Sequence, residues 1–131
     1  MDYTICYVSS EKDKDITNLT NLFSTTLANN NKKDITGILL YLEGTFLQVL
    51  EGNQEDLKTL FDKIKQDVRH KDIFVIINKG IDQRIFDQYK SGFDTIESKE
   101  DLLKLQQYLT NYKKDLDSSK SILGILEPFL L

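Results

Sequence analysis

Two apolar stretches joined by a short polar turn are the clearest feature of the hydrophobic pattern. Residues 35–42 read ITGILLYL and residues 45–50 read TFLQVL, with Glu43-Gly44 between them. Apolar stretches of this length on either side of a glycine-containing turn predict a β-hairpin. Residues 3–8 predict a further strand. Residues 73–77 are all apolar, which predicts a strand at the centre of the sheet.

Helical spacing of apolar residues, each time behind a polar capping residue, predicts the helices. Leu57, Phe61 and Ile64 follow Asn53 on one helical face. Ser98 and Asp101 have the spacing of a capping box. The predicted helices begin at Asp13 or Asp15, at Asn53, at Ser98, and at Asp117 or Ser118, and the last one ends near Pro128.

With a weak last strand over residues 91–96, the predicted element order is β-α-β-β-α-β-β, followed by the C-terminal helices. This order predicts an α+β, ferredoxin-like sheet with two helices on one face and a C-terminal helical pair on the other. We expect residues 1–97 to form one domain and residues 98–131 a helical extension that packs on the sheet. The alternative is that the apolar end, Phe129-Leu130-Leu131, serves a partner surface. We expect a turn near Asn78-Lys79-Gly80.

Composition narrows the class of protein. The chain has 131 residues, 40% hydrophobic and 29% charged, which is typical of one ordinary domain with its own core. Its formal net charge of −4 argues against a nucleic-acid partner. No apolar run approaches the ~20 residues that span a bilayer, and the start lacks a leader pattern. We therefore expect a cytoplasmic protein without a membrane partner.

Residue counts exclude several chemistries. Cys6 is the only cysteine, which excludes an intramolecular disulfide, and His70 is the only histidine. Neither a multi-histidine nor a cysteine-rich metal centre fits these counts, so we expect no metal ligands. A nucleophile with a histidine base would have to use His70, and nothing around it resembles a nucleophile turn.

One amide lies inside an otherwise apolar predicted strand. With a period of two, Gln48 shares a face with Phe46 and Leu50 and points toward the core. A buried amide without partners costs roughly 1–3 kcal/mol, so we expect a partner, and Tyr7 on the first strand is a candidate. Alone, each is compatible with an ordinary core side chain. Together, they suggest a polar ligand with an aromatic body, while Cys6 on the other face is expected to be inert.

Several short segments, in order and at matching intervals, resemble a known family. The segments are residues 5–9 (ICYVS), 29–30 (NN), 35–37 (ITG), 46–52 (FLQVLEG), 67–70 (DVRH) and 84–86 (RIF). Their combination resembles the BLUF domain, a flavin-binding sensor of blue light, over roughly residues 3–97. Any one segment would be weak support, whereas the ordered set on a matching fold pattern is strong.

The resemblance implies a bound flavin, usually FAD, with FMN or riboflavin as alternatives. In the family, blue light moves an electron and then a proton from a tyrosine to the flavin, and a glutamine rearranges its hydrogen bonds. Tyr7 matches that tyrosine and Gln48 matches the glutamine. The resemblance further implies that Asn29, Asn30, Asp67, Arg69 and His70 match flavin-contacting or pocket-rim positions.

The chain departs from the family pattern just before the last predicted strand. Tyr89 stands where the family usually has tryptophan, and Ser91 stands where it has methionine. These positions are thought to carry the signal outward from the glutamine in the family. We therefore expect Tyr89 and Ser91 to be relay residues whose hydrogen bonding differs from the family's.

Two other functions are compatible with parts of the pattern. An enzyme of the acylphosphatase type could use this fold, but Arg69 and Arg84 are not on the first loop where that chemistry requires them. A degenerate, non-photoactive module that binds flavin or another small ligand is the main alternative. We expect no enzyme activity. As a short form, the protein is expected to act through a downstream partner protein and to form homo-oligomers.

Overall fold

The computed structural model describes residues 2–11, 34–66, 70–89, 92–112 and 117–130. The first predicted helix lies outside these residues. The strands are β1 (Asp2–Glu11), β2 (Thr36–Leu42), β3 (Thr45–Gly52), β4 (His70–Ile81) and β5 (Phe93–Ile96). The helices are α2 (Gln54–Lys65), α3 (Lys99–Tyr112), α4 (Asp117–Leu126) and the 3-10 turn η1 (Glu127–Leu130).

The strands form one sheet in the order β4-β1-β3-β2-β5. β1 runs antiparallel to both β3 and β4, and β2 runs antiparallel to β3. The first four strands in this order have the ferredoxin-like arrangement, and β5 is added in parallel beside β2. The predicted α+β class and ferredoxin-like sheet are therefore confirmed.

The predicted hairpin is formed by β2 and β3. Its turn residues Glu43 and Gly44 both have positive φ, 53° and 83°, as a type I′ turn requires. Gly37 is also held at a positive φ of 142°, where the β2 backbone passes close to β3. A Cβ atom at Gly37 would lie 1.8 Å from the carbonyl oxygen of Val49, so only glycine fits this position.

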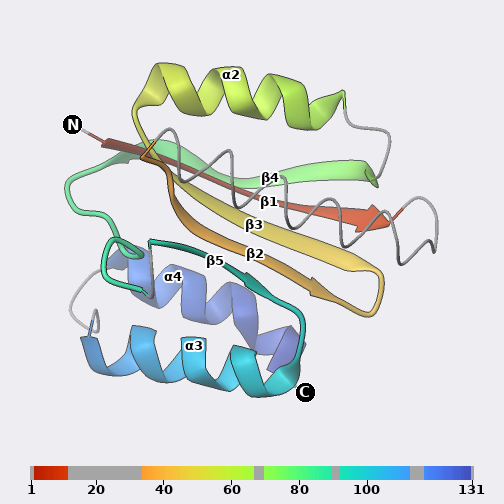
Figure 1. The fold of residues 1–131 in the computed structure, drawn as a ribbon, viewed down its shortest axis with the longest axis vertical. Helices are drawn as coiled ribbons and strands as arrows, with labels where there is room; N and C mark the ends of the chain where they lie inside the picture. The colour runs from red at the N-terminus through yellow and green to blue at the C-terminus, as the bar shows by residue number, and fades with distance from the viewer. Residues whose placement is uncertain (1, 12–33, 67–69, 90–91, 113–116, 131) are drawn as a thin grey trace.

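Helices cover both faces of the sheet (Figure 1), with α2 at the top of the view and α3 and α4 at the bottom. The predicted Asn53 cap is present, since its Oδ1 accepts hydrogen bonds from the N–H groups of Glu55 and Asp56. On the α2 face the buried apolar residues are Ile5, Tyr7, Ile35, Leu39, Phe46, Leu50, Leu57, Phe61 and Phe93. On the α3 and α4 face they include Cys6, Ile38, Leu40, Leu47, Val49, Leu102, Leu105, Leu109, Ile122 and Leu126.

β4 differs from its prediction in place and in length. The apolar run at 73–77 lies on a strand at the edge of the sheet, so the prediction of a central strand was wrong. Phe74 is accordingly 67% exposed. The predicted turn at Asn78-Lys79-Gly80 was also wrong, because β4 stays paired with β1 as far as Ile81. The polar residues Asn78 and Lys79 are compatible with an edge strand, because one edge of such a strand faces solvent.

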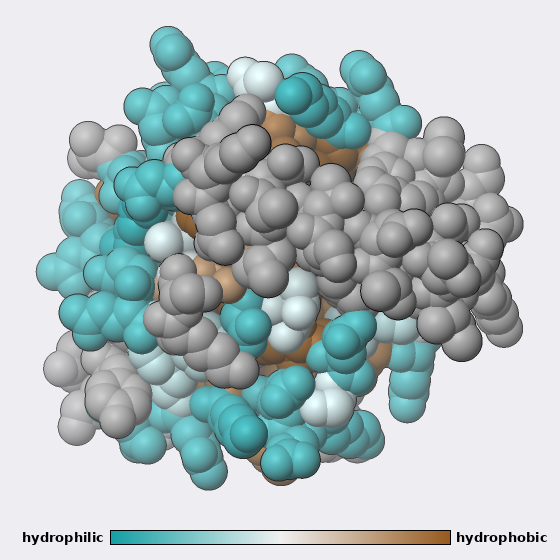
Figure 2. All heavy atoms as spheres, in the orientation of Figure 1, coloured by the Kyte–Doolittle hydropathy of each residue, from teal (hydrophilic) through white to brown (hydrophobic). Residues whose placement is uncertain are grey.

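One face of the molecule can be followed in a space-filling view (Figure 2). Figure 2 shows mostly hydrophilic described residues in this view, with hydrophobic surface visible in recesses between them. Among the described helices, none is long and apolar enough to cross a membrane.

Candidate functional site

Tyr7 on β1 and Gln48 on β3 lie directly opposite each other in the antiparallel pairing of the two strands. The Tyr7 hydroxyl donates a hydrogen bond to Oε1 of Gln48. Each side chain is only 3% exposed. Side chains of opposed residues in an antiparallel pair point to the same face, which is why strand register alone brings these two groups together.

The surroundings of this pair are apolar and aromatic. The pair belongs to the face that α2 covers, where the Tyr7 ring lies 5.5 Å from the Phe61 ring at an interplanar angle of 44°. Leu39 and Phe46 are buried on the same face. The Gln48 amide accepts the Tyr7 hydrogen bond at Oε1 and also carries an NH₂ group, which is a donor of the kind that binds a polar ligand edge. An apolar wall with one amide at its edge fits a flavin ring, which has an apolar body and a polar rim.

The other predicted flavin contacts cannot be placed around this pair. Asn29, Asn30, Asp67 and Arg69 lie outside the described residues. His70 begins β4, and its side chain is outside the description as well. Their roles stay predictions from the resemblance.

Of the two predicted relay residues, Ser91 lies outside the described residues and Tyr89 lies on the opposite side of the sheet from Gln48. The Tyr89 side chain is buried in the apolar cluster beneath α3 and α4. Its ring is 4.8 Å from the Tyr108 ring at 53° and 6.2 Å from the Phe86 ring. Burial, with Asp94 and Asp101 nearby, raises the pKa of Tyr89 to about 12.

Cys6 alternates with Tyr7 on β1 and points to the α3 and α4 face. Its side chain is 0% exposed. Burial raises the pKa of the Cys6 thiol to about 12, so little thiolate forms near neutral pH. The sheet therefore separates the only cysteine of the chain from the Tyr7–Gln48 pair.

Arg84 is held by the start of β1 and the approach to β2. Its Nε and one terminal nitrogen bind the Asp2 carboxylate at 2.8 and 3.3 Å, and the other terminal nitrogen donates to the Asp34 carbonyl oxygen at 2.8 Å. These contacts raise the pKa of Arg84 through its hydrogen bond with Asp2. A guanidinium engaged in this way does not support the phosphatase alternative.

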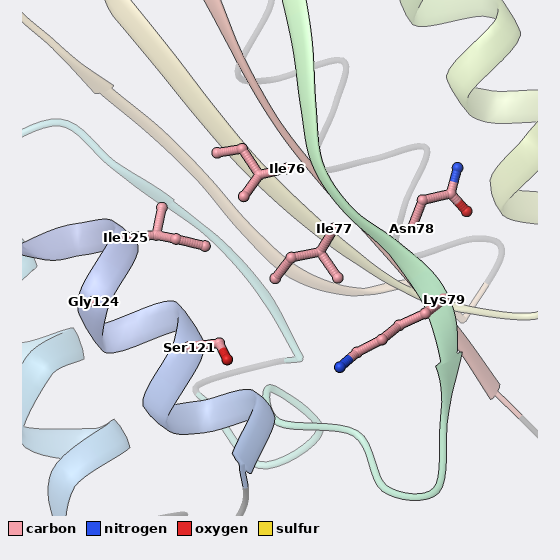
Figure 3. Close-up of a pocket in the computed structure, with 7 residues that line it drawn as sticks. All are labelled: Ile76, Ile77, Asn78, Lys79, Ser121, Gly124 and Ile125. Carbon is pink, nitrogen blue, oxygen red and sulfur yellow. The ribbon is translucent and has the colours of Figure 1, made fainter.

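A groove on the other side of the sheet is distinct from the Tyr7–Gln48 pair. Its lining residues come from β4 and α4 (Figure 3), with Ile76 and Ile77 on one wall and Ile125 on the other. Lys79 extends across it toward α4. The groove has a volume of about 570 Å³ and is widely open. Among the described residues, no cluster of potential metal ligands occurs here or elsewhere.

Glu51 is a buried residue that the sequence analysis did not single out. It is 0% exposed and accepts hydrogen bonds from the Thr36 hydroxyl and from the N–H groups of Ile85 and Phe86. Burial raises the pKa of Glu51, and these hydrogen bonds oppose the rise. The sequence pattern did indicate that Glu51 faces inward, because it lies two and four residues after the apolar residues Val49 and Leu47 on the same predicted strand.

Comparisons with known proteins agree with the geometry. A sequence model of the family "BLUF: Sensors of blue-light using FAD" matches residues 3–92. Photoactivated adenylate cyclase subunit alpha of Euglena gracilis is 41% identical over 76 residues, which are 58% of this chain and 7% of that protein. The chain thus spans a small part of this relative.

Solved structures of similar fold extend over nearly the whole chain. Klebsiella pneumoniae BlrP1 with FMN and cyclic diGMP has a TM-score of 0.76 and 27% identity, covering 99% of this chain and 34% of that one. BlrB, described as a BLUF protein in its dark state, has a TM-score of 0.70 and 25% identity, covering 95% and 97% of the two chains.

Proposed function

Because this chain belongs to the BLUF family of blue-light sensors that use FAD, we propose that it is a blue-light photoreceptor switched by Tyr7 and Gln48. The observation that carries the proposal is the hydrogen bond between these two buried side chains on the α2 face. It places a residue that can release an electron and a proton against a residue that can reverse its hydrogen bonding.

We propose that the protein holds FAD beside the Tyr7–Gln48 pair, with FMN or riboflavin as alternatives. When bound, the flavin supplies blue-light absorption and reversible acceptance of an electron and a proton. The described wall formed by Leu39, Phe46 and Phe61 would exclude water from the pair. By resemblance, Asn29, Asn30, Asp67, Arg69 and His70 would complete the site.

Tyr7 would release an electron from its ring and the proton from its hydroxyl. In the structure that hydroxyl donates to Oε1 of Gln48. Without its proton, the Tyr7 oxygen can only accept, so the favoured Gln48 arrangement presents the amide NH₂ to it instead of Oε1. In the dark, the electron and proton return to Tyr7 and the first arrangement is restored. No product forms, so we propose that the chain is a sensor without catalysis.

Output would leave through the C-terminal helices toward a partner protein. α3 and α4 pack on the face opposite the pair, and Tyr89 lies between the sheet and Tyr108 of α3. We propose Tyr89 and Ser91 as relay residues, with residues 1–97 as the sensor and residues 98–131 as the output extension. We also propose that the protein acts on a downstream partner protein and forms homo-oligomers.

Tyr89 also keeps the second candidate function open. Its ring packs in the core beneath α3, beside Tyr108. The family usually has tryptophan at this position, and a module that has lost its photocycle could tolerate the change to tyrosine. That candidate is a non-photoactive flavin-binding or small-ligand regulator.

Absorption spectroscopy of the purified full chain separates the two functions. A photoreceptor shows a bound-flavin spectrum that shifts to longer wavelength under blue light and returns in the dark. A colourless protein, or a flavin spectrum unchanged by light, supports the regulatory module. Chromatography of the flavin released by heat identifies FAD, FMN or riboflavin.

A further inference from the structure

Glu51 is a carboxylate enclosed near the end of β3, on the face that α3 and α4 cover. With Thr4, Lys79, Ser121 and Ile122 among its neighbours, it lines a cavity of about 10 Å³, room for at most one water molecule. Its hydrogen-bond donors are uncharged groups. The cost of burying the carboxylate is opposed by these hydrogen bonds and by the positive charge of Arg84, so the position of Glu51 depends on its partners.

Glu51 joins three separate parts of the chain. One carboxylate oxygen accepts the Thr36 hydroxyl of β2 at 2.8 Å and the Phe86 N–H at 3.0 Å. The other oxygen accepts the Ile85 N–H at 2.6 Å. Hydrogen bonds to a carboxylate are short and strong, so the bonds from Ile85 and Phe86 hold the segment between β4 and β5 firmly against β3. The bond from Thr36 ties the same carboxylate to β2.

The same segment is bonded to α3. The Tyr108 hydroxyl of α3 donates to the carbonyl oxygen of Ile85 at 2.6 Å. The Tyr108 ring also contacts Tyr89, which follows in the same segment. A continuous set of hydrogen bonds therefore runs from Glu51 of β3 through Ile85 to Tyr108 of α3.

We propose that Glu51 is a positioning residue that couples the Tyr7–Gln48 pair to α3 through Ile85 and Tyr108. Gln48 and Glu51 lie on the same strand, three residues apart, at about 10 Å along its length. A displacement of β3 that accompanies rearrangement of Gln48 moves the Glu51 carboxylate and, with it, the Ile85 backbone. This inference rests on the proposed photoreceptor function and adds a route to the opposite face of the sheet.

Hydrogen–deuterium exchange of the flavin-loaded full chain, in darkness and under blue light, tests the coupling. In the parent protein we expect light to change the exchange of the Ile85 and Phe86 amides and of α3. Glu51→Gln keeps the size of the side chain but replaces one acceptor oxygen with an NH₂ group, which only donates. Because the Ile85 and Phe86 N–H groups bind different oxygens, one of these two bonds is lost. This variant should keep the flavin red shift and lose the light-dependent change in α3.

Two further variants make the test specific. Tyr108→Phe removes the next bond in the set, so the light-dependent change should persist at Ile85 and be lost in α3. Thr4→Val is the matched control, because its buried hydroxyl bonds the Leu50 carbonyl oxygen at 3.0 Å beside the same cavity. It should keep both the red shift and the change in α3. If Glu51→Gln does not fold, Tyr108→Phe decides the question.

A light-dependent change in α3 that survives in Glu51→Gln or in Tyr108→Phe would overturn the coupling. So would its loss in Thr4→Val, or a parent protein that shows the red shift without any change in α3. Faster exchange in the dark with an unaltered light response would assign Glu51 a purely structural role. Absence of the red shift in the parent would instead refute the photoreceptor function, and this inference with it.

Discussion

The hydroxyl of Tyr7 donates to Oε1 of Gln48 across adjacent antiparallel strands, with both side chains buried under α2. Because the two residues are register partners, their contact is set by the backbone of β1 and β3 rather than by a flexible loop. Groups held on neighbouring strands keep their geometry, so a change in one hydrogen bond between them separates two discrete arrangements. This rigidity allows Tyr7 and Gln48 to switch between two distinct hydrogen-bond arrangements.

Replacing the amide should abolish the light response. Gln48→Leu places an apolar side chain of similar size on an apolar face and removes every donor and acceptor of the amide, so we expect flavin binding without the red shift. The Tyr7 hydroxyl loses an acceptor, which should lower the free energy of unfolding by about 1–3 kcal/mol. Light-minus-dark absorption spectra measure the effect. Gln54→Leu, at an exposed position on α2, is the control and should keep the full shift.

Gly37→Ala should destabilise the sheet strongly. The positive φ of 142° and a Cβ position 1.8 Å from the Val49 carbonyl oxygen leave no room for a methyl group. Backbone strain and overpacking together should cost about 3 kcal/mol or more in the free energy of unfolding. Denaturant unfolding measures this loss. Gly124→Ala on α4 meets nothing within 4 Å and should instead stabilise by up to ~1 kcal/mol; equal effects at both sites would contradict the argument.

Cys6 should be unreactive in the folded protein. Its thiol is fully buried, and burial raises its pKa to about 12. A thiol-reactive chromogenic reagent at pH 8 should therefore label the chain only after denaturation.

Since Cys6 lies on the face opposite Tyr7 and Gln48, heat or acid should also release all the flavin into solution. Rapid labelling of the native protein, or colour retained by the precipitated chain, would contradict this placement.

The Asp2–Arg84 ion pair should make stability depend on acid pH. The hydrogen bond from Arg84 lowers the pKa of Asp2 below its ordinary value of 3.8. A lowered carboxyl pKa contributes stability above the ordinary value, and this contribution is lost as the pH falls through the folded-state pKa. Asp2→Asn should thus be less stable than the parent near pH 6, with the difference shrinking below pH 3.8.

Thermal unfolding of both proteins across this pH range tests the Asp2 prediction. Asp62→Asn is the control, because its ion pair with Lys65 is exposed and contributes little. A difference between the parent and Asp2→Asn that stays constant from pH 6 to pH 3 would show that ionisation of Asp2 is not its source.

Local patterns predicted the parts of this fold that depend on neighbours in the sequence. The Glu43-Gly44 turn and the Asn53 cap are short-range features, and the structure confirms both. The inward direction of Gln48 followed from strand alternation. Its contact with Tyr7 needed, in addition, the pairing of β1 with β3, which the ferredoxin-like order supplied.

Features that depend on strand order or on contacts between distant segments were not predictable in the same way. The apolar run at 73–77 indicates a strand, but its place at the sheet edge depends on which strands pair. Strand alternation turns Glu51 inward with Leu47 and Val49, but its partners, the Ile85 and Phe86 N–H groups, come from a distant segment. Tyr89 lies beneath α3, on the side of the sheet away from Gln48, because the segment before β5 packs there. No local pattern encodes these contacts.

The most direct test of the switch compares two tyrosines on the same face of β1. Tyr7→Phe removes the hydroxyl that bonds Gln48, and Tyr3→Phe removes one that bonds Asn78. Light-minus-dark absorption spectra of both flavin-loaded variants should show the full reversible red shift in Tyr3→Phe and none in Tyr7→Phe, with flavin bound in each. A full red shift in Tyr7→Phe would contradict the assignment of Tyr7 as the light-active residue.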